Sequence, residues 1–269
     1  MIKSIIKRVR YRVASLGRRL EVIARNLFGW VQIDEELINE SREYWSAAPS
    51  GQLKSNAHWR EGHAFDPPGV WERLGRQHRD LLLRAANEEG LTELRRIVDW
   101  GCGGGMNAVQ LAADARSYYG VDVSEQTLEE CKRQVSLLDV NSFQPVLIDA
   151  ANPEACLQAI SEPCDAFVCT YVFELLPTRE YGWRIMRLAH SLLRPGGVAL
   201  IHIRYTNSLS QQSRPWQYAK NLANNTSYGL AEFRAGAASI GFELLFEEVI
   251  PKQDDLNERR YAFFALKRT

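Results

Sequence analysis

The sequence of 269 residues has no long apolar segment and no excess of charge of either sign. Lysine and arginine number 33, and so do aspartate and glutamate, so the formal net charge is zero. A membrane-spanning helix needs about 20 consecutive apolar residues, which argues against a membrane-spanning protein. Neutrality argues against nucleic acid as the main partner, because phosphate binding needs surplus cations. The 45% of hydrophobic residues is typical of a globular protein.

The sequence also lacks any cysteine spacing typical of a metal site, any internal repeat and any low-complexity tract. Five cysteines are an odd number, and no apolar signal-peptide segment precedes them. We therefore expect reduced thiols in a cytoplasmic protein without a metal site. The five residues are Cys102, Cys131, Cys156, Cys164 and Cys169.

The zero net charge hides an uneven distribution. Residues 1–30 hold eight basic groups and only one acid, and the remaining 239 residues have a net charge of −7. Within residues 1–30, apolar residues recur at steps of three and four, which predicts one basic amphipathic helix. Such a helix can lie on an anionic membrane surface, bind a partner helix, or pack on the sheet. The cationic excess favours the membrane surface, at the inner face of the membrane.

Residues 31–94 read as a helical and aromatic lid segment. Helices are expected over 33–46 and from Pro68 to Ala86, joined by a loop over 47–67. His78 and His190 are expected on helix surfaces.

From residue 95 to residue 269 short apolar strands alternate with helical stretches, which predicts an α/β fold with a doubly wound parallel sheet. The expected strands are Ile97–Trp100, Ser117–Val123, Val146–Ile148, Ala166–Thr170 and Val198–Ile203. The expected crossover helices are Asn107–Ala115, Ser124–Leu138, Pro153–Ile160 and Arg179–Leu193. A helix over Leu230–Ile240 precedes an antiparallel hairpin of Phe242–Val249 and Tyr261–Lys267.

A glycine-rich turn follows the first of these strands and opens a helix. Glycine lets the backbone approach a ligand closely, and a helix N-terminus offers unpaired N–H groups. Met106 stands where a dinucleotide fingerprint needs a small residue, and no Lys-Ser/Thr follows, so a pyrophosphate site and a P-loop are disfavoured. Asp122 ends the second strand, where a carboxylate can accept both hydroxyls of a ribose. Asp149 ends the third strand in the same manner.

Four segments in this order resemble the class I S-adenosylmethionine-dependent methyltransferases: DWGCGGG, YYGVDVS, CDAFVCTYVFELLP and LLRPGGVALI. The resemblance covers about residues 95–269. It implies a Rossmann-like seven-stranded sheet of order 3-2-1-4-5-7-6 with the last strand antiparallel, here with an N-terminal helical extension. It also implies S-adenosyl-L-methionine as cofactor. By position, Asp99, Gly101, Cys102, Gly103 and Gly105 would hold the methionine part. Asp122 with Val123 would bind the ribose, Asp149 and Ala150 the adenine, and Thr170 and Tyr171 the sulfonium side.

The chain departs from the family at the acceptor side. Many relatives that methylate small hydroxyl compounds read Glu-His-Leu after the fourth strand, whereas this chain reads Glu174-Leu175-Leu176. An Asn/Asp-Pro-Pro-Tyr motif of amino-methylating relatives is also missing there. A hydroxyl acceptor needs a base. The candidates are His202 at the end of the fifth strand, His63 and His58 in the upstream loop, and Tyr171 or Glu174, with His202 as the first choice.

A polar and aromatic loop over residues 204–229 follows the fifth strand and is expected to form a substrate wall, with Arg204, Arg214, Trp216 and Tyr218 suited to a glycan or anionic group. The favoured activity is O-methylation of a sugar, glycan or lipid-linked intermediate at a membrane surface. A soluble methyltransferase for a small hydroxylated natural product and a catalytically silent scaffold are the alternatives. The sequence leaves the acceptor and the oligomeric state open.

Overall fold

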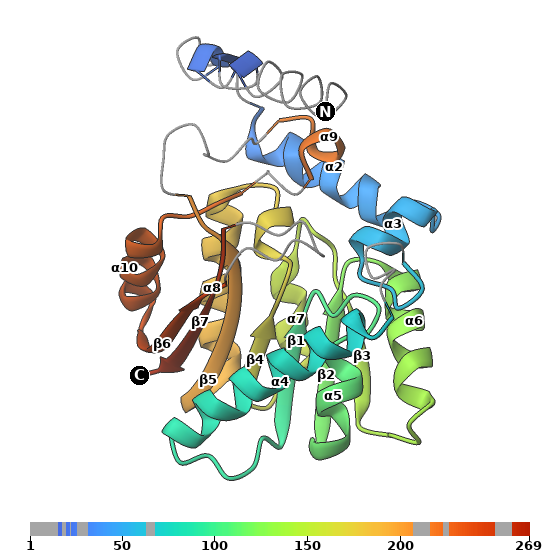
Figure 1. Cartoon of the computed structure of the whole chain (residues 1–269), viewed down its shortest axis with the longest axis vertical. Helices are drawn as coiled ribbons and strands as arrows, with labels where there is room; N and C mark the ends of the chain where they lie inside the picture. Colours follow the sequence, from blue (N-terminus) through green and yellow to red (C-terminus); the bar gives the residue numbers. More distant parts are fainter. Residues whose placement is uncertain are drawn as a thin grey trace, which may run out of the picture.

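The structure is a computed structural model that describes residues 16–17, 20–21, 23–25, 32–62, 68–206, 216–222, 226–250 and 260–269. Its centre is a seven-stranded sheet of order β3-β2-β1-β4-β5-β7-β6, as the family resemblance implies (Figure 1). The first five strands in sequence are parallel where they pair, and β7 pairs antiparallel with both β5 and β6. The strands are β1 Arg96–Trp100, β2 Ser117–Asp122, β3 Phe143–Leu147, β4 Cys164–Cys169, β5 Leu193–Arg204, β6 Phe242–Val249 and β7 Tyr261–Arg268.

Both faces of the sheet are buried, which explains why the central strands read as continuous apolar runs. Successive residues of a strand point to opposite faces, so Ala166 and Val168 of β4 join one core cluster while Phe167 and Cys169 join the other. All four side chains are fully buried. A single register slip of β4 would exchange the two sets, so the pattern fixes the pairing.

Helices cover the two faces in two groups (Figure 1). One group packs its apolar side chains against β1, β2 and β4 and consists of α4 Val70–Glu88, α5 Ala108–Leu111 and α6 Glu125–Ser136. The other group covers the opposite face and consists of α7 Cys156–Ala159, α8 Arg179–Leu192 and α10 Leu230–Ile240. Side-chain caps start two of these helices, since Ser124 accepts from the amide of Thr127 and Thr178 from the amide of Tyr181.

A separate layer lies across one end of the sheet. It comprises residues 32–62, with α2 Asp34–Ser46 and α3 Gly51–Asn56, and residues 216–222, with α9 Tyr218–Asn221; we call this layer the cover (Figure 1). The loop expected over 47–67 is wrong at its centre, because Ser50 caps α3 by accepting from the amide of Leu53. Ser50 is a typical N-cap residue, but the prolines and glycines of this segment indicated a loop more strongly than a short helix.

Several predicted boundaries also shift. The crossovers after β1 and β3 are single short turns of α-helix joined to 3₁₀ turns, η2 Ala112–Asp114 and η3 Pro153–Ala155. A further 3₁₀ turn, η4 Phe173–Leu175, follows β4. Strand β5 begins five residues early, at Leu193, which pairs with Cys164 of β4; the pairing register shifts across the Pro-Gly-Gly segment before Val198 pairs with Ala166. The predicted surface position of His78 is wrong: this residue is fully buried on the inner side of α4.

Most of the predicted basic helix over residues 1–30 lies outside the described residues. The described positions 16–17, 20–21 and 23–25 are helical, and Leu16, Leu20 and Ile23 among them are more than half exposed. No helix in the described part of the chain is both long and apolar enough to cross a bilayer. The division at residues 30 and 94 stays a prediction.

The contact between α8 and Tyr228 tests the packing of the second helix group. A methyl group on Gly182 would meet the hydroxyl of the buried Tyr228 ring. We expect Gly182→Ala to lower the free energy of unfolding by about 1–3 kcal/mol, because overpacking outweighs the helix preference of alanine. Chemical denaturation measures this loss. Gly51→Ala is the control, since a methyl group there has no neighbour within 4 Å; an equal loss in both variants would contradict the packing.

Candidate functional site

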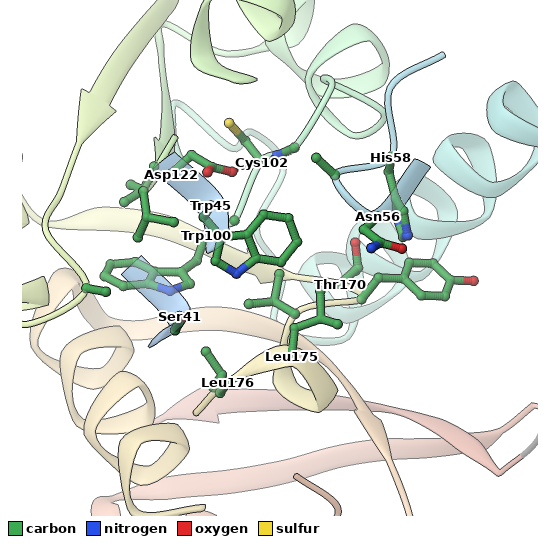
Figure 2. A pocket seen from close by; sticks show the side chains of 18 of the residues that line it. Ser41, Trp45, Asn56, His58, Trp100, Cys102, Asp122, Thr170, Leu175 and Leu176 are labelled. Atoms are coloured by element: carbon green, nitrogen blue, oxygen red, sulfur yellow. Dashed lines mark hydrogen bonds between the residues drawn. The ribbon is translucent and has the colours of Figure 1, made fainter. Parts of the chain in front are cut away.

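A cleft opens between the cover and the strand ends. It encloses about 880 Å³ including its open mouth. Asp122, Trp45 and Trp100 lie on one side of it and Asn56, His58 and Thr170 on the other (Figure 2). Of the predicted cofactor residues, eight line the cleft: Gly101, Cys102, Gly103, Asp122, Val123, Ala150, Thr170 and Tyr171. Asp99, Gly105 and Asp149 are not part of its lining.

The glycine-rich loop after β1 is held by its own amides. All five N–H groups from Gly101 to Gly105 donate to protein oxygens at 2.8–3.1 Å: two to Val121, and one each to Asp122, Ala57 and Cys102. Contrary to the sequence expectation, these N–H groups are therefore not free to bind an anion. This arrangement fits a ligand without phosphate.

The glycines of this loop also let the cover approach. Gly103 has a φ of 53°, and a Cβ on it would lie 2.6 Å from the carbonyl oxygen of Ala57. A Cβ on Gly104 would lie 2.5 Å from the Cα of Trp59, and the amide of Gly104 donates to Ala57 at 2.8 Å. The loop and the cover thus meet backbone to backbone, which only glycine permits.

Asp122 presents its carboxylate at the end of β2. One oxygen accepts from the amide of Gly103 at 3.1 Å and the other from the amide of Ser124 at 3.0 Å. Burial raises the pKa of Asp122 to about 6, while the backbone hydrogen bonds lower it. The fixed carboxylate retains lone pairs to accept the two hydroxyls of a ribose.

Asp99 lies under the cleft, not in its lining. Its oxygens accept from the hydroxyl of Tyr118 at 2.8 Å and from Nδ2 of Asn107 at 3.0 Å. Burial raises the pKa of Asp99 to about 6 against these two hydrogen bonds. Asp99 can therefore affect a ligand only through Asn107, which does line the cleft.

Asp149 and Ala150 separate at the end of β3. Ala150 is buried and lines the cleft with Ile148. Asp149 faces outward, where its carboxylate pairs with Arg42 of α2 at 3.4 Å and accepts from the amide of Ala151. The apolar floor at this end therefore suits an adenine ring, while Asp149 ties the cover to the sheet.

Tyr171 lies at the centre of a cluster of imidazole rings. Its ring centroid is 4.4 Å from that of His202, 4.9 Å from that of His58 and 5.7 Å from that of His78. Its φ of 59° is in the left-handed region, which is rare for a bulky residue and concentrates at functional sites. His58 has a φ of 55° as well.

The predicted bases lie in different places. His202 is fully buried outside the cleft lining, and its Nδ1 accepts from the amide of Tyr171 at 3.2 Å. Burial holds the pKa of His202 well below its ordinary value. His63 lies outside the described residues, and Tyr171 lines the cleft. His58 also lines the cleft, and burial lowers its pKa to about 4. His202 and His58 are therefore neutral at physiological pH.

Sequence reasoning missed four residues of the cover that line the cleft: Ser41, Trp45, Asn56 and Ala57. Trp45 of α2 donates from Nε1 to the hydroxyl of Tyr218 at 2.8 Å, and this hydroxyl donates to the carbonyl of Leu175 at 2.5 Å. Ser41 and Asn56 also face the cleft. The predicted substrate wall is present only in part: Tyr218 lines the cleft, whereas Trp216 is buried with its ring 4.7 Å from Arg25. Arg214 lies outside the described residues. The density of aromatic residues in the cover is the sequence signal that could have indicated the residues missed there.

Comparison with known proteins agrees with this geometry. Residues 97–197 match a protein-family model described as a methyltransferase domain. No curated protein sequence matches the chain significantly. In fold, the chain is similar to the N-methyltransferase NodS from Bradyrhizobium japonicum WM9 in complex with S-adenosyl-L-homocysteine, with 13% identity, a TM-score of 0.58, and coverage of 81% of this chain and 96% of that one.

Two further solved structures share the fold. An S-adenosylmethionine-dependent methyltransferase from Clostridium acetobutylicum ATCC 824 has 12% identity and a TM-score of 0.54, with 72% of this chain and 91% of that chain covered. TehB from Haemophilus influenzae has 18% identity and a TM-score of 0.51, with 71% of this chain covered. The chain spans only 62% of the length of TehB.

The cleft fits S-adenosylmethionine. It offers a carboxylate for the ribose and a buried apolar floor for the adenine. The amides of its glycine-rich loop are already hydrogen-bonded, and this ligand has no phosphate that would need them. Because the imidazoles around Tyr171 are neutral, they do not repel the positive charge of a sulfonium group. Among the described residues, no group of three or more His, Cys, Asp or Glu side chains is arranged to hold a metal ion.

Asp122 provides the direct test of this fit. We expect Asp122→Asn to weaken S-adenosylhomocysteine binding about 10- to 100-fold, because hydrogen bonds to a charged acceptor contribute roughly 1.5–3 kcal/mol. Wild-type affinity should fall as the pH drops through about 6, where the carboxylate becomes protonated, and the Asp122→Asn variant should lose the part of that dependence that comes from Asp122. Titration calorimetry measures both. Asp114→Asn, at an exposed carboxylate, is the control; wild-type affinity of the Asp122 variant together with an undiminished pH dependence would refute the assignment.

Proposed function

Because the chain carries a class I S-adenosylmethionine-dependent methyltransferase domain, we propose that it methylates a hydroxyl oxygen of a sugar, glycan or lipid-linked intermediate. The observation that carries this proposal is the neutral imidazole of His58, which lines the cleft beside Tyr171. A hydroxyl acceptor must lose its proton during the transfer, and a neutral imidazole can receive it.

The lining of the cleft also argues against an anionic acceptor. Carboxylates and phosphates are usually bound by arginine or lysine, and no described residue that lines the cleft is of either type. Aromatic side chains of the cover, of β1 and of the turn after β4 line it instead, and aromatic faces suit the apolar faces of sugar rings. A neutral polyhydroxylated acceptor fits this lining best.

The chain's own residues would act by binding and exclusion. S-adenosylmethionine supplies the activated methyl group when bound. Asp122 and the floor around Ala150 would hold the nucleoside, and Asn107 and Thr170 would lie nearer the reacting end. Trp45 and Tyr218 close the cleft from the cover, which would exclude water and align the acceptor.

A transfer assay with radiolabelled S-adenosylmethionine tests the acceptor class. We expect label in monosaccharide glycosides, oligosaccharides or polyprenyl-linked sugars, with none in protein or RNA. Label on a small hydroxylated natural product alone would replace the glycan with that class. Label only on protein, nucleic acid or an amine nitrogen would refute the proposal. Absence of cofactor binding by calorimetry would identify a catalytically silent scaffold.

The N-terminal segment supports a location at the inner face of a membrane as part of this proposal. Residues 1–30 are strongly cationic, and the described apolar side chains Leu16, Leu20 and Ile23 are each more than half exposed. An amphipathic cationic helix binds anionic headgroups through charge and the acyl boundary through its apolar stripe. A lipid-linked acceptor would then lie close to the cleft.

Vesicle co-sedimentation tests this location. We expect the full chain to bind vesicles with 30 mol% phosphatidylglycerol (roughly the charge density at which each basic residue adds about 1 kcal/mol) and not neutral vesicles. Replacing Lys3, Lys7, Arg8, Arg10 and Arg12 by Gln should weaken binding at least about tenfold. Replacing Arg76, Arg84, Arg116, Lys132 and Arg187 by Gln is the matched control. Equal binding by both variants would contradict the membrane assignment and leave the methyl-transfer proposal intact.

A further inference from the structure

Asn56 is a side chain of the cleft that the predicted cofactor residues do not include. It ends α3 in the cover, is half-buried, and lines the cleft on the side opposite Asp122 (Figure 2). The next residue, Ala57, accepts from the amide of Gly104 at 2.8 Å. Asn56 therefore lies where the cover meets the glycine-rich loop.

Several other donors that line the cleft are already used within the protein. Both Nδ2 protons of Asn107 donate to neighbouring side chains. The side chains of Trp45, Tyr181 and Tyr218 each donate to a protein oxygen. The amides of residues 101–105 are hydrogen-bonded as well. These groups can donate to a ligand only by giving up a bond within the protein.

The side-chain amide of Asn56 retains a proton for a ligand. Its Nδ2 donates to the hydroxyl of Tyr44 at 2.5 Å, which fixes the orientation of the side chain. A carboxamide has two N–H protons. The second one has no acceptor in the described part of the chain. A fixed N–H group that faces a cleft and has no protein acceptor is placed to donate to a ligand.

The order of the strands shows which part of the cofactor reaches Asn56. Along the edge β3-β2-β1-β4, the adenine floor at Ala150 follows β3, Asp122 ends β2 and the glycine-rich loop follows β1. A ligand with its adenine at the first and its ribose at the second position extends its amino-acid part across the third. There a Cβ on Gly103 would lie 2.6 Å from the carbonyl oxygen of Ala57, directly beside Asn56.

We propose that Asn56 binds the carboxylate of the amino-acid part of S-adenosylmethionine and so links the cofactor to the cover. Carboxylate oxygens are strong acceptors of N–H bonds. The same part of the cofactor carries an ammonium group that balances the carboxylate, so a neutral amide is a sufficient partner. The described lining of the cleft, which contains neither arginine nor lysine, fits such a balanced group. This role of Asn56 concerns the cofactor and holds whatever the methyl acceptor is.

Titration calorimetry at about pH 8, where aspartate is ionised, tests the contact with two probes. One is S-adenosylhomocysteine, and the other is its decarboxylated analogue, which keeps the nucleoside, the sulfur and the amine. We expect Asn56→Asp to weaken S-adenosylhomocysteine binding at least about 30-fold, because a carboxylate replaces a donor and repels the ligand carboxylate. The analogue should bind at least as tightly as to the wild type, since the new carboxylate attracts its amine.

Asn56→Ala supplies a second variant without added charge. It should weaken S-adenosylhomocysteine binding about tenfold and leave binding of the analogue unchanged. Asn87→Asp, at an exposed position of α4, adds the same charge away from the cleft and is the matched control.

Binding of the analogue also shows whether each variant keeps its nucleoside site. Wild-type affinity of Asn56→Asp for S-adenosylhomocysteine, or an equal loss for both probes, would overturn the proposal. Tighter binding of S-adenosylhomocysteine would put the ammonium group at Asn56 and would overturn it as well.

Hydrogen exchange measures the link between cofactor and cover. A ligand that contacts both the sheet and the cover should slow local opening of the cover. We expect saturating S-adenosylhomocysteine to slow exchange of the amides of residues 51–62 at least about threefold more than the saturating analogue does. In Asn56→Ala the two ligands should protect these amides equally. Equal protection in the wild type would contradict the link.

Neither measurement involves a methyl acceptor. Failure of the Asn56 contact therefore leaves the proposed O-methylation intact. Failure of methyl transfer to hydroxyl compounds likewise leaves the role of Asn56 to be decided by the two probes.

Discussion

The backbone contact between the glycine-rich loop and Ala57 is the constraint on which the site depends. Without side chains at Gly103 and Gly104, the cover comes within hydrogen-bond distance of the loop. This contact places α2 and α3 across the strand ends, so that a cleft forms between the cover and the sheet. The glycines thus allow the cover to enclose the site and also allow a ligand to approach the backbone. In the same geometry every amide from Gly101 to Gly105 donates to a protein oxygen.

A second constraint is the buried carboxylate of Asp99. It fixes the amide of Asn107, and that amide in turn fixes Thr170 and His78. One charge on β1 therefore sets donor and acceptor directions along four segments: β1, the loop before α5, the turn after β4, and α4. Because Asp99 lies beneath the cleft, it determines which atoms of Asn107 donate and which accept hydrogen bonds. Its position in the sequence alone suggested direct contact with the cofactor.

The fold was predictable because its signals are local and repeated. Fully buried strands such as β4, alternating with amphipathic helices, indicate the parallel sheet, and the family resemblance carried by the four motifs implies the strand order that the structure has. The cofactor half of the cleft was predictable for the same reason, since Asp122 and Ala150 follow strands directly. The rest of the cleft was not, because Trp45 and Asn56 reach it from the cover through tertiary packing. His78 packs behind the cleft from a helix whose sequence shows only amphipathicity. A lone histidine on such a helix carries no sign of its burial.

The antiparallel strand β7 brings the end of the chain beside the middle of it. Phe263 packs on both His78 and His202, and Tyr261 stacks on His202 with an interplanar angle of 13°. The ring cluster around Tyr171 is therefore assembled from segments distant in sequence, whereas Asp122 and Ala150 follow strands that are close together in sequence. Substitutions in the first set can accumulate without altering the second, so this architecture allows substrate preference to diverge during evolution while the source of the methyl group stays constant.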